Sequence, residues 1–181
     1  MVLHKLNSFV ITGAPGTGKS SLLEALSKKG YNVYTEIARQ VIAESQLAGI
    51  PLTPWQDLPG FTEEVMSRRV FQFPDIPNDT VTFLDRSLPD SLAYLDWGGE
   101  KTKPHWYEWA QKYRHATTVF ICPPWEVIYD VDEQRKESFE ESKEIHEHMV
   151  NAYNRLNYSL VEIPLIPVEE RATFIEEVLF S

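Results

Sequence analysis

The sequence predicts a single α/β domain in which helices cover both faces of a parallel β-sheet. Short segments rich in β-branched and aromatic residues alternate along the chain with segments of helical periodicity. Residues 117–122 are almost all apolar, which is typical of a strand buried on both faces. Residues 8–26 give a strand, a glycine-rich loop and a helix. Right-handed crossovers between such strands produce three layers.

Length and composition fit one domain with ordinary globular chemistry. The chain has 181 residues, enough to bury about 70% of the unfolded surface in a single core. It carries 17 basic and 27 acidic residues, a formal net charge of −10, which disfavours binding to a nucleic acid. Cys122 is the single cysteine and lies in an apolar run, which indicates a buried thiol. No apolar run approaches 18 residues, so we expect a cytoplasmic protein with no membrane partner.

The glycine-rich loop after the first strand is the most informative motif. Residues 13–20 read Gly-Ala-Pro-Gly-Thr-Gly-Lys-Ser and satisfy the P-loop pattern G-x-x-x-x-G-K-S/T, with a strand before them and a helix after them. Backbone N–H groups of such a loop surround phosphate oxygens at a helix N-terminus. We expect Lys19 to reach the β- and γ-phosphates and Ser20 to hold Mg²⁺. The predicted nucleotide-binding residues are Gly13, Ala14, Pro15, Gly16, Thr17, Gly18, Lys19, Ser20 and Ser21.

The second predicted strand, residues 31–35, leads directly into a helix over 36–48. Glu36 therefore stands at the carboxyl end of a strand, where open α/β sheets bind ligands. Glu36 and Arg39 are three residues apart and share a helix face. The pair is either a substrate contact or a first-turn acid matched to the helix dipole with a surface ion pair. Spacing alone leaves both interpretations open.

A loop over residues 50–60 and a helix over 61–73 come next. This helix carries Arg68 and Arg69, which either face a substrate anion or form a solvated basic edge, and we expect the edge. The third strand, residues 80–84, then ends in Asp85-Arg86-Ser87.

Asp85 follows a core strand of the predicted sheet. In a P-loop protein such an acid binds Mg²⁺ or accepts a proton from an attacking hydroxyl, and the alternative is a cap on the next helix. Arg86 offers a guanidinium fork that fits a phosphate or carboxylate.

The second half of the chain continues the alternation. The predicted elements are, in order, helix 88–94, an aromatic-rich helix 104–114, strand 117–122, helix 143–158, strand 159–163 and helix 168–180. The aromatic helix could line a site for a ring-shaped substrate, although packing is the commoner use of such rings. Residues 126–142 are dense in charge and predict an exposed flap, which is either a solvated face or a lid. Within it, Arg135 could close onto a transferring phosphoryl group.

Four features together resemble the P-loop nucleoside and nucleotide kinase superfamily: the P-loop, the Glu36-Ile37-Ala38-Arg39 turn, the Asp85-Arg86-Ser87 motif and Asp132-Glu133-Gln134-Arg135. The chain most resembles the predicted-ATPase group related to the nicotinamide riboside kinase domain of the bacterial NAD regulator. Arg86 and Ser87 look closer to the motif of deoxynucleoside and thymidylate kinases. The resemblance implies a three-layer P-loop NTPase fold with a five-stranded parallel sheet of order 2-3-1-4-5. It also implies one kinase-like domain over 1–181 with a short lid at about 123–142.

The resemblance also implies roles for individual residues. Lys19 would clamp phosphate, Ser20 would bind magnesium, and Asp85 would bind metal or handle a proton. The implied substrate contacts are Glu36, Arg39 and Arg86, and the implied lid arginine is Arg135.

The leading functional hypothesis is a kinase that uses ATP and Mg²⁺ to phosphorylate a small metabolite, namely a nucleoside, a nucleotide or a ribosylated pyridine. The alternative is a nucleotide-dependent binding or switch protein. The sequence contains no Asn-Lys-x-Asp or Thr-Lys-x-Asp motif, which argues against an ordinary GTPase. An AAA-type motor is disfavoured because the third strand ends in Phe83-Leu84-Asp85-Arg86 without an Asp-Glu pair. The acceptor, the purine preference and the oligomeric state stay open.

Overall fold

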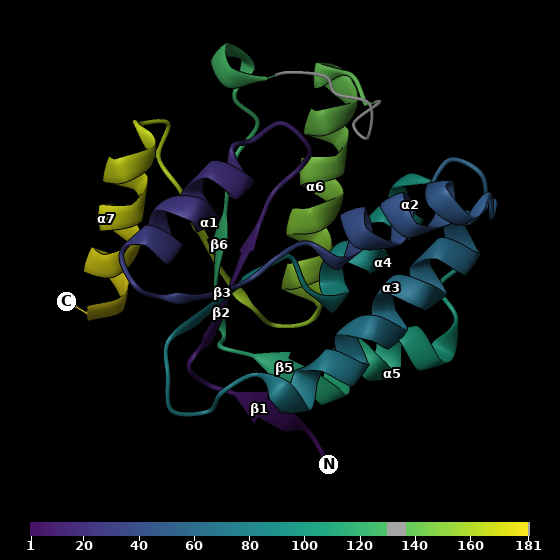
Figure 1. The fold of residues 1–181 in the computed structure, drawn as a ribbon, viewed down its shortest axis with the longest axis horizontal. Helices are drawn as coiled ribbons and strands as arrows, with labels where there is room; N and C mark the ends of the chain where they lie inside the picture. The colour runs from purple at the N-terminus through teal and green to yellow at the C-terminus, as the bar shows by residue number, and fades with distance from the viewer. Residues whose placement is uncertain (130–136, 181) are drawn as a thin grey trace.

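A five-stranded parallel β-sheet runs through the centre of the protein (Figure 1). We describe it from a computed structural model, which places residues 1–129 and 137–180. The strands, in chain order, are β2 (Ser8–Thr12), β3 (Asn32–Tyr34), β4 (Thr82–Asp85), β6 (Thr118–Ile121) and β7 (Ser159–Glu162). Their spatial order is β3-β4-β2-β6-β7, and every pairing is parallel. Counted among themselves, these strands have the expected order 2-3-1-4-5.

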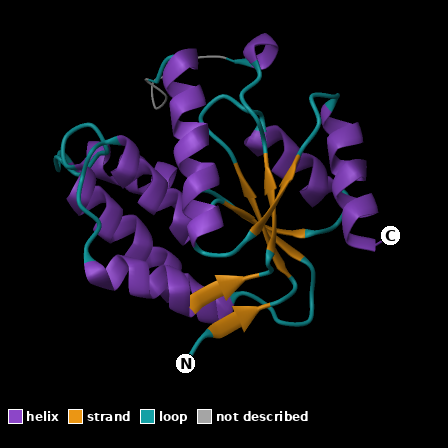
Figure 2. Cartoon of the chain, turned by 180° about the vertical axis from the view of Figure 1, so that it is seen from behind, coloured by secondary structure: helices purple, strands orange, loops and turns teal. Residues whose placement is uncertain are grey.

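Helices cover both faces of this sheet and confirm the three-layer prediction (Figures 1 and 2). The described helices are α1 (Lys19–Lys28), α2 (Ile37–Ala48), α3 (Leu58–Gln72), α4 (Leu88–Trp97), α5 (Pro104–Lys112), α6 (Phe139–Arg155) and α7 (Val168–Phe180), with 3₁₀ turns η1 (Phe73–Asp75) and η2 (Glu126–Ile128). Helices α1 and α7 pack on one face, and α4 and α6 on the other. Helices α3 and α5 pack outside α4, and α2 packs on α3. None of the described helices is both long and apolar enough to cross a membrane.

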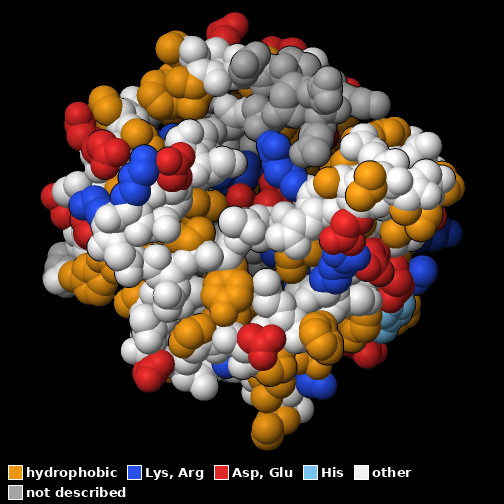
Figure 3. Space-filling view, viewed as in Figure 1, with side chains coloured by type: hydrophobic (Ala, Val, Ile, Leu, Met, Phe, Trp, Pro, Cys, Tyr) orange, Lys and Arg blue, Asp and Glu red, His pale blue; other side chains and the backbone are white. Residues whose placement is uncertain are grey.

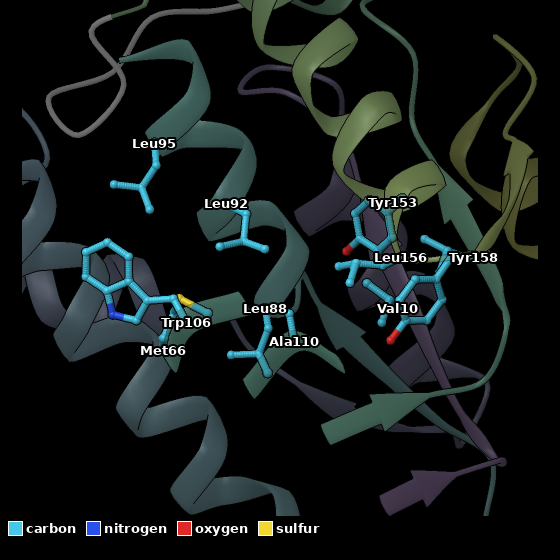
Figure 4. Packing of buried hydrophobic residues seen from close by; sticks show 11 residues of the cluster. Val10, Met66, Leu88, Leu92, Leu95, Trp106, Ala110, Tyr153, Leu156 and Tyr158 are labelled. Carbon is cyan, nitrogen blue, oxygen red and sulfur yellow. The ribbon is translucent and has the colours of Figure 1, made fainter. Parts of the chain in front are cut away.

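Alternation along the strands divides the core into two main clusters. On β2, Val10 belongs to the cluster beneath α4 and α6, whereas its neighbour Ile11 belongs to the cluster beneath α1 and α7. Figure 4 shows the first cluster, in which the leucines of α4 lie between Trp106 of α5 and Tyr153 of α6. Because both faces of the sheet are covered, the strands are apolar on both sides, as predicted for residues 117–122.

A small second sheet was not predicted. Strand β1 (Leu3–Lys5) pairs in parallel with β5 (Tyr113–His115) at the lower end of the molecule in Figure 1. The prediction of a helix over 104–114 is therefore wrong at its end, because α5 stops at Lys112 and the chain becomes extended. Ser8 Oγ lies 2.7 Å from His115 Nδ1, which ties the new strand to the start of β2. These are contacts between segments more than 100 residues apart, which local periodicity does not contain.

Helix α6 begins four residues before its predicted start. Ser138 caps it: the Ser138 hydroxyl accepts from the Glu141 N–H at 3.3 Å, and the Glu141 carboxylate accepts from the Ser138 N–H at 2.6 Å. This is a capping box, whose Ser-x-x-Glu spacing is visible in the sequence. Residues 139–142, predicted as flap, are therefore helical. Residues 130–136 of the predicted flap lie outside the described residues, so the lid stays a prediction.

The aromatic residues of the predicted helix 104–114 serve packing rather than the main cavity. The Trp106 side chain is fully buried, and its indole N–H donates to Glu63 at 3.0 Å. Trp109 and Tyr113 pack against the same cluster, whereas Tyr107 is 37% exposed. None of these four rings is among the described residues that line the main cavity. The packing alternative is therefore the correct one.

We predict that Trp106→Ala lowers the free energy of unfolding by about 3–5 kcal/mol, because it leaves a cavity between α3, α4 and α5. Urea denaturation followed by circular dichroism measures the change. Tyr107→Ala on the same helix is the matched control, with an expected change of about 0.5 kcal/mol or less, since its ring is partly exposed. Equal losses in the two variants would contradict the assignment of Trp106 to the core.

Candidate functional site

The P-loop connects β2 to α1, and its backbone requires glycine at two positions. Gly18 is the N-cap of α1 and has φ 80°, in the left-handed region. A Cβ at Gly18 would lie 2.8 Å from a guanidinium nitrogen of Arg171. A Cβ at Gly13 would lie 2.5 Å from the carbonyl oxygen of Cys122, at the end of β6. A side chain at Gly13 would therefore collide with the backbone of the neighbouring strand, and at Gly18 the left-handed backbone itself disfavours one.

Lys19 is buried at the base of this loop. Its ammonium donates to the carbonyl oxygens of Gly13 and Ala14, each at 2.8 Å. Burial and the positive charge of Arg86 lower the pKa of Lys19 to about 8. The ammonium thus sits in a poorly solvated position inside a ring of backbone groups, where an anion such as phosphate would stabilise its charge.

Glu36 is at the N-cap of α2, but its side chain makes no capping hydrogen bond. Its carboxylate instead lies 2.9 Å from Arg86 Nε and accepts from Arg39 Nε at 3.2 Å. Only 14% of the side chain is exposed. The ion pair with Arg39 expected for a first-turn acid is present, but Glu36 is largely buried and belongs to a cluster that spans the ends of β3 and β4.

Glu36 and Asp85 differ in their protonation behaviour. Burial would raise the pKa of Glu36, but the charges of Arg86 and Lys19 lower it below its ordinary value. Burial, with the negative charge of Glu36 added, raises the pKa of Asp85 to about 6. Of the two carboxylates, Glu36 is the one that stays ionised at neutral pH, and Asp85 is the one that titrates close to it.

Arg86 crosses between two carboxylates. Its backbone is in the left-handed region, with φ 66°, which is uncommon for a side chain of this size. The Arg86 N–H donates to Ile11 at 3.0 Å, and its carbonyl oxygen accepts from Arg69 at 2.8 Å, so the unusual conformation is fixed on both sides. The buried guanidinium then reaches Glu36 on one side and, at 3.3 Å, Asp90 on the other.

Asp90 is the residue that holds Arg86 from α4. Its carboxylate accepts from the Ser87 N–H at 2.8 Å and from the Tyr153 hydroxyl at 2.5 Å, and the Thr12 hydroxyl also donates to it. Ser87, not Asp85, is the cap of α4. We did not predict Asp90 as a site residue, although the Ser87-x-x-Asp90 spacing gives the capping box that places it.

Asp85 itself is only 5% exposed, and its Oδ1 atom is buried without a hydrogen-bond partner among the described residues. Such an orphaned carboxylate oxygen, with the hydroxyl of Ser20, suits a hard cation such as Mg²⁺. Within the described part of the chain no group of three or more His, Cys, Asp or Glu residues could hold a metal alone. Mg²⁺ is commonly held by one or two protein ligands together with water and substrate phosphates.

One cavity of about 480 Å³ connects the P-loop with the Glu36 cluster. Its lining residues include most of the predicted P-loop residues together with Glu36, Arg39 and Arg86, so the cavity brings together the predicted nucleotide-binding and substrate-binding residues. Acidic and basic side chains meet in a hollow near the middle of the face shown in Figure 3. Asp85 does not line the cavity, but it is near enough to Glu36 and Lys19 for their charges to affect its pKa.

Arg171 marks the other end of the cavity and was missed from the sequence. It comes from α7, is 2% exposed and donates to the Thr17 carbonyl oxygen at 3.2 Å. Its guanidinium carbon lies 6.0 Å from the centre of the Trp125 ring. Trp125, Pro167 and Val168 line the cavity beside it. An arginine in a C-terminal helix belongs to no sequence motif, so only the structure shows that Arg171 contacts the P-loop and lines the cavity.

The side chains of Arg68 and Arg69 lie in different environments. Arg68 pairs with Glu44 at 2.6 Å and with Glu64 at 2.7 Å outside the cavity, as expected for a solvated basic edge. Arg69 is 9% exposed and lines the cavity, so the same prediction is wrong for it. Consecutive helix positions point in directions about 100° apart, which is why one pair serves two environments. Arg135 lies outside the described residues, and its role as a lid arginine stays a prediction.

Comparisons with solved structures place this fold among nucleoside and nucleotide kinases. A deoxyadenosine kinase from M. mycoides with bound dCMP and dCDP superposes with a TM-score of 0.68 at 14% identity, covering 95% of this chain and 97% of that chain. A thymidylate kinase from Ehrlichia chaffeensis gives 0.65 at 14% identity, covering 95% and 97%. The NadR protein in complex with NR gives 0.71 at 17% identity, covering 98% of this chain and 52% of that one.

The fold and the loop define this chain as a P-loop protein whose fold is similar to that of solved kinases. A family model described as an AAA domain matches residues 8–171, which is most of the chain. The chain therefore belongs to that AAA-domain family. The search of curated proteins found no match.

We predict that Asp90→Asn lowers the free energy of unfolding by about 3 kcal/mol, because it leaves the buried Arg86 charge without one of its partners. Urea denaturation gives the value. Asp96→Asn, on the same helix, is the control. Asp96 pairs with the exposed Arg155, so its loss should cost less than about 1 kcal/mol. A loss in Asp90→Asn no larger than in the control would show that the buried network does not hold Arg86.

Proposed function

We propose that the protein is an ATP- and Mg²⁺-dependent kinase that phosphorylates a hydroxyl group of a small metabolite: a nucleoside, a nucleotide or a ribosylated pyridine. One observation carries the proposal: a single cavity joins the P-loop to the Glu36–Arg86 cluster. A protein that only holds a nucleotide needs no second polar cluster facing its phosphates. The kinases with the same fold support this choice by analogy.

The donor nucleotide would occupy the end of the cavity beside α1 and α7. The P-loop amides and Lys19 would bind its phosphates, and the Lys19 ammonium would offset the charge that moves during transfer. The base would lie near Trp125, Pro167 and Arg171, which line that end. Ser20 and Asp85 would hold Mg²⁺, which supplies neutralisation of phosphate charge when it is bound.

The acceptor would occupy the end beside α2, α3 and α4. Glu36 faces the cavity and would accept a hydrogen bond from the acceptor hydroxyl, while Arg86 fixes the carboxylate. The hydroxyl oxygen forms a bond to the γ-phosphorus and the bond from that phosphorus to the β,γ-bridging oxygen breaks. The proton leaves to the Glu36 carboxylate, which lines the cavity and whose pKa lies below its ordinary value, so that it is ionised and able to accept the proton.

The proposal includes a cytoplasmic location and no nucleic-acid partner. The net charge of −10 disfavours a polyanion, and the single cysteine, Cys122, is a buried free thiol.

We predict acceptor-dependent transfer from γ-labelled ATP to at least one member of a nucleoside, nucleotide and pyridine riboside panel. Asp85→Asn should lower kcat about 10²-fold or more, because it removes a carboxylate from proton and metal handling. Asp79→Asn, at an exposed turn, is the control and should match the wild type. The kinase proposal fails if no acceptor reacts faster than background hydrolysis and Asp85→Asn changes nothing. Tight nucleotide binding with that result would favour a binding or switch protein.

We also predict a bell-shaped pH dependence of kcat/KM for MgATP at saturating acceptor. Activity should rise as pH increases through about 6, where Asp85 loses its proton, and fall through about 8, where Lys19 loses its charge. In Asp85→Asn, the part of the acidic limb of the profile that comes from Asp85 should disappear. Any acidic limb that remains then reports titration of the nucleotide. A profile that is the same in wild type and Asp85→Asn would contradict the assignment.

A further inference from the structure

The acceptor end of the cavity has no surplus of positive charge. Three arginines, Arg39, Arg69 and Arg86, line it together with the carboxylates of Glu36 and Asp90. The Asp85 carboxylate does not line the cavity, but it is near enough for its charge to interact with Arg86 and Arg69. The formal charges of these three arginines and three carboxylates cancel before any ligand binds. Lys19 belongs to the P-loop and is already required by the donor phosphates. An acceptor that carries its own phosphate would therefore bring negative charge into a site that is balanced without it.

The guanidinium groups are also engaged by the protein itself. Arg86 lies between Glu36 at 2.9 Å and Asp90 at 3.3 Å. Arg39 donates from Nε to Glu36 at 3.2 Å. Arg69 directs its terminal nitrogens at the carbonyl oxygens of Asp85 and Arg86, which leaves only a single buried Nε. Strong phosphate recognition uses a guanidinium fork, with two parallel N–H groups, and these contacts engage at least one N–H group of each arginine.

Part of the remaining wall of this end is apolar. Trp55 from the loop before α3, and Leu58, Phe61 and Val65 from α3, line the cavity there. Phe61 is 8% exposed and Trp55 is 41% exposed, so the wall runs from the interior to the mouth of the cavity. Flat rings bind to such walls by burying apolar area, whereas a phosphate gains nothing from them.

We propose that the acceptor is an unphosphorylated nucleoside-class compound, neutral or cationic, and that nucleoside monophosphates are rejected. Its sugar hydroxyl binds at Glu36 and Arg86, and its ring packs on the wall formed by Trp55, Leu58, Phe61 and Val65. This inference rests on the proposed function and selects one substrate class within it.

The test compares matched pairs: adenosine, deoxyadenosine, cytidine, thymidine and nicotinamide riboside, each against its own 5′-monophosphate. Two quantities are measured for each compound, namely kcat/KM for phosphoryl transfer from MgATP, and the Kd from calorimetry with a non-hydrolysable ATP analogue present. We expect the best nucleoside to exceed its monophosphate at least 100-fold in kcat/KM and at least 10-fold in affinity.

The outcomes separate this inference from the kinase proposal. A monophosphate that is the better substrate overturns the inference and leaves the kinase intact. Nucleosides that bind more tightly but are never phosphorylated support the inference about the site and overturn phosphoryl transfer. If neither class binds or reacts, or if monophosphates bind more tightly without reaction, both fail.

A variant that removes the Glu36 charge tests whether the charge balance of the site causes the rejection of monophosphates. Glu36→Gln removes the carboxylate that engages Arg86 and Arg39, so the affinity for the monophosphate should rise relative to the nucleoside by at least 10-fold. Glu64→Gln is the matched control, because Glu64 pairs with Arg68 outside the cavity and should leave the ratio of the two Kd values unchanged. An unchanged ratio in Glu36→Gln, with wild-type affinity for the ATP analogue showing an intact fold, overturns the charge argument.

Discussion

The Arg86 guanidinium, held between Glu36 and Asp90, is the interaction on which the rest of the site depends. It connects the end of β3 to the start of α4, and its own left-handed backbone turns the chain out of β4. A buried charge of this kind is tolerated only when its partners are fixed, because removing one partner leaves an uncompensated ion. Asp90 is fixed by Thr12, Ser87 and Tyr153, so elements from both ends of the chain specify one side-chain position.

The same interaction accounts for the protonation states of the site. Arg86 keeps Glu36 ionised despite burial, and the resulting negative charge helps to raise the pKa of Asp85. Two neighbouring carboxylates thus have different tasks available to them: one accepts hydrogen bonds throughout the neutral range, and the other exchanges a proton near pH 6. Arg86 also contributes to the lowered pKa of Lys19, which connects the cluster electrostatically to the P-loop.

Short sequence motifs predicted those site residues whose positions depend on the chain immediately around them. The P-loop, the sheet order implied by the resemblance, and the positions of Glu36 and Arg86 in one cavity agree with the structure. Arg69, Arg171 and Asp90 were missed because their roles depend on contacts across the fold, such as the one between Arg171 and Thr17, 154 residues apart. Strand β5 was missed for the same reason, since its partner β1 is at the other end of the sequence. Arg69 is buried whereas the neighbouring Arg68 is only half-buried, and this difference is likewise a property of the packed helix α3.

The two ends of the cavity belong to opposite layers of the fold. The end assigned to the donor is lined by α1 and α7 from one face of the sheet, and the end assigned to the acceptor by α2, α3 and α4 from the other. The P-loop lies where the layers meet, at the carboxyl edge of the sheet, because β2 is its central strand. Under the proposed assignment, changes in the acceptor layer would alter the choice of acceptor without disturbing the groups proposed to bind ATP.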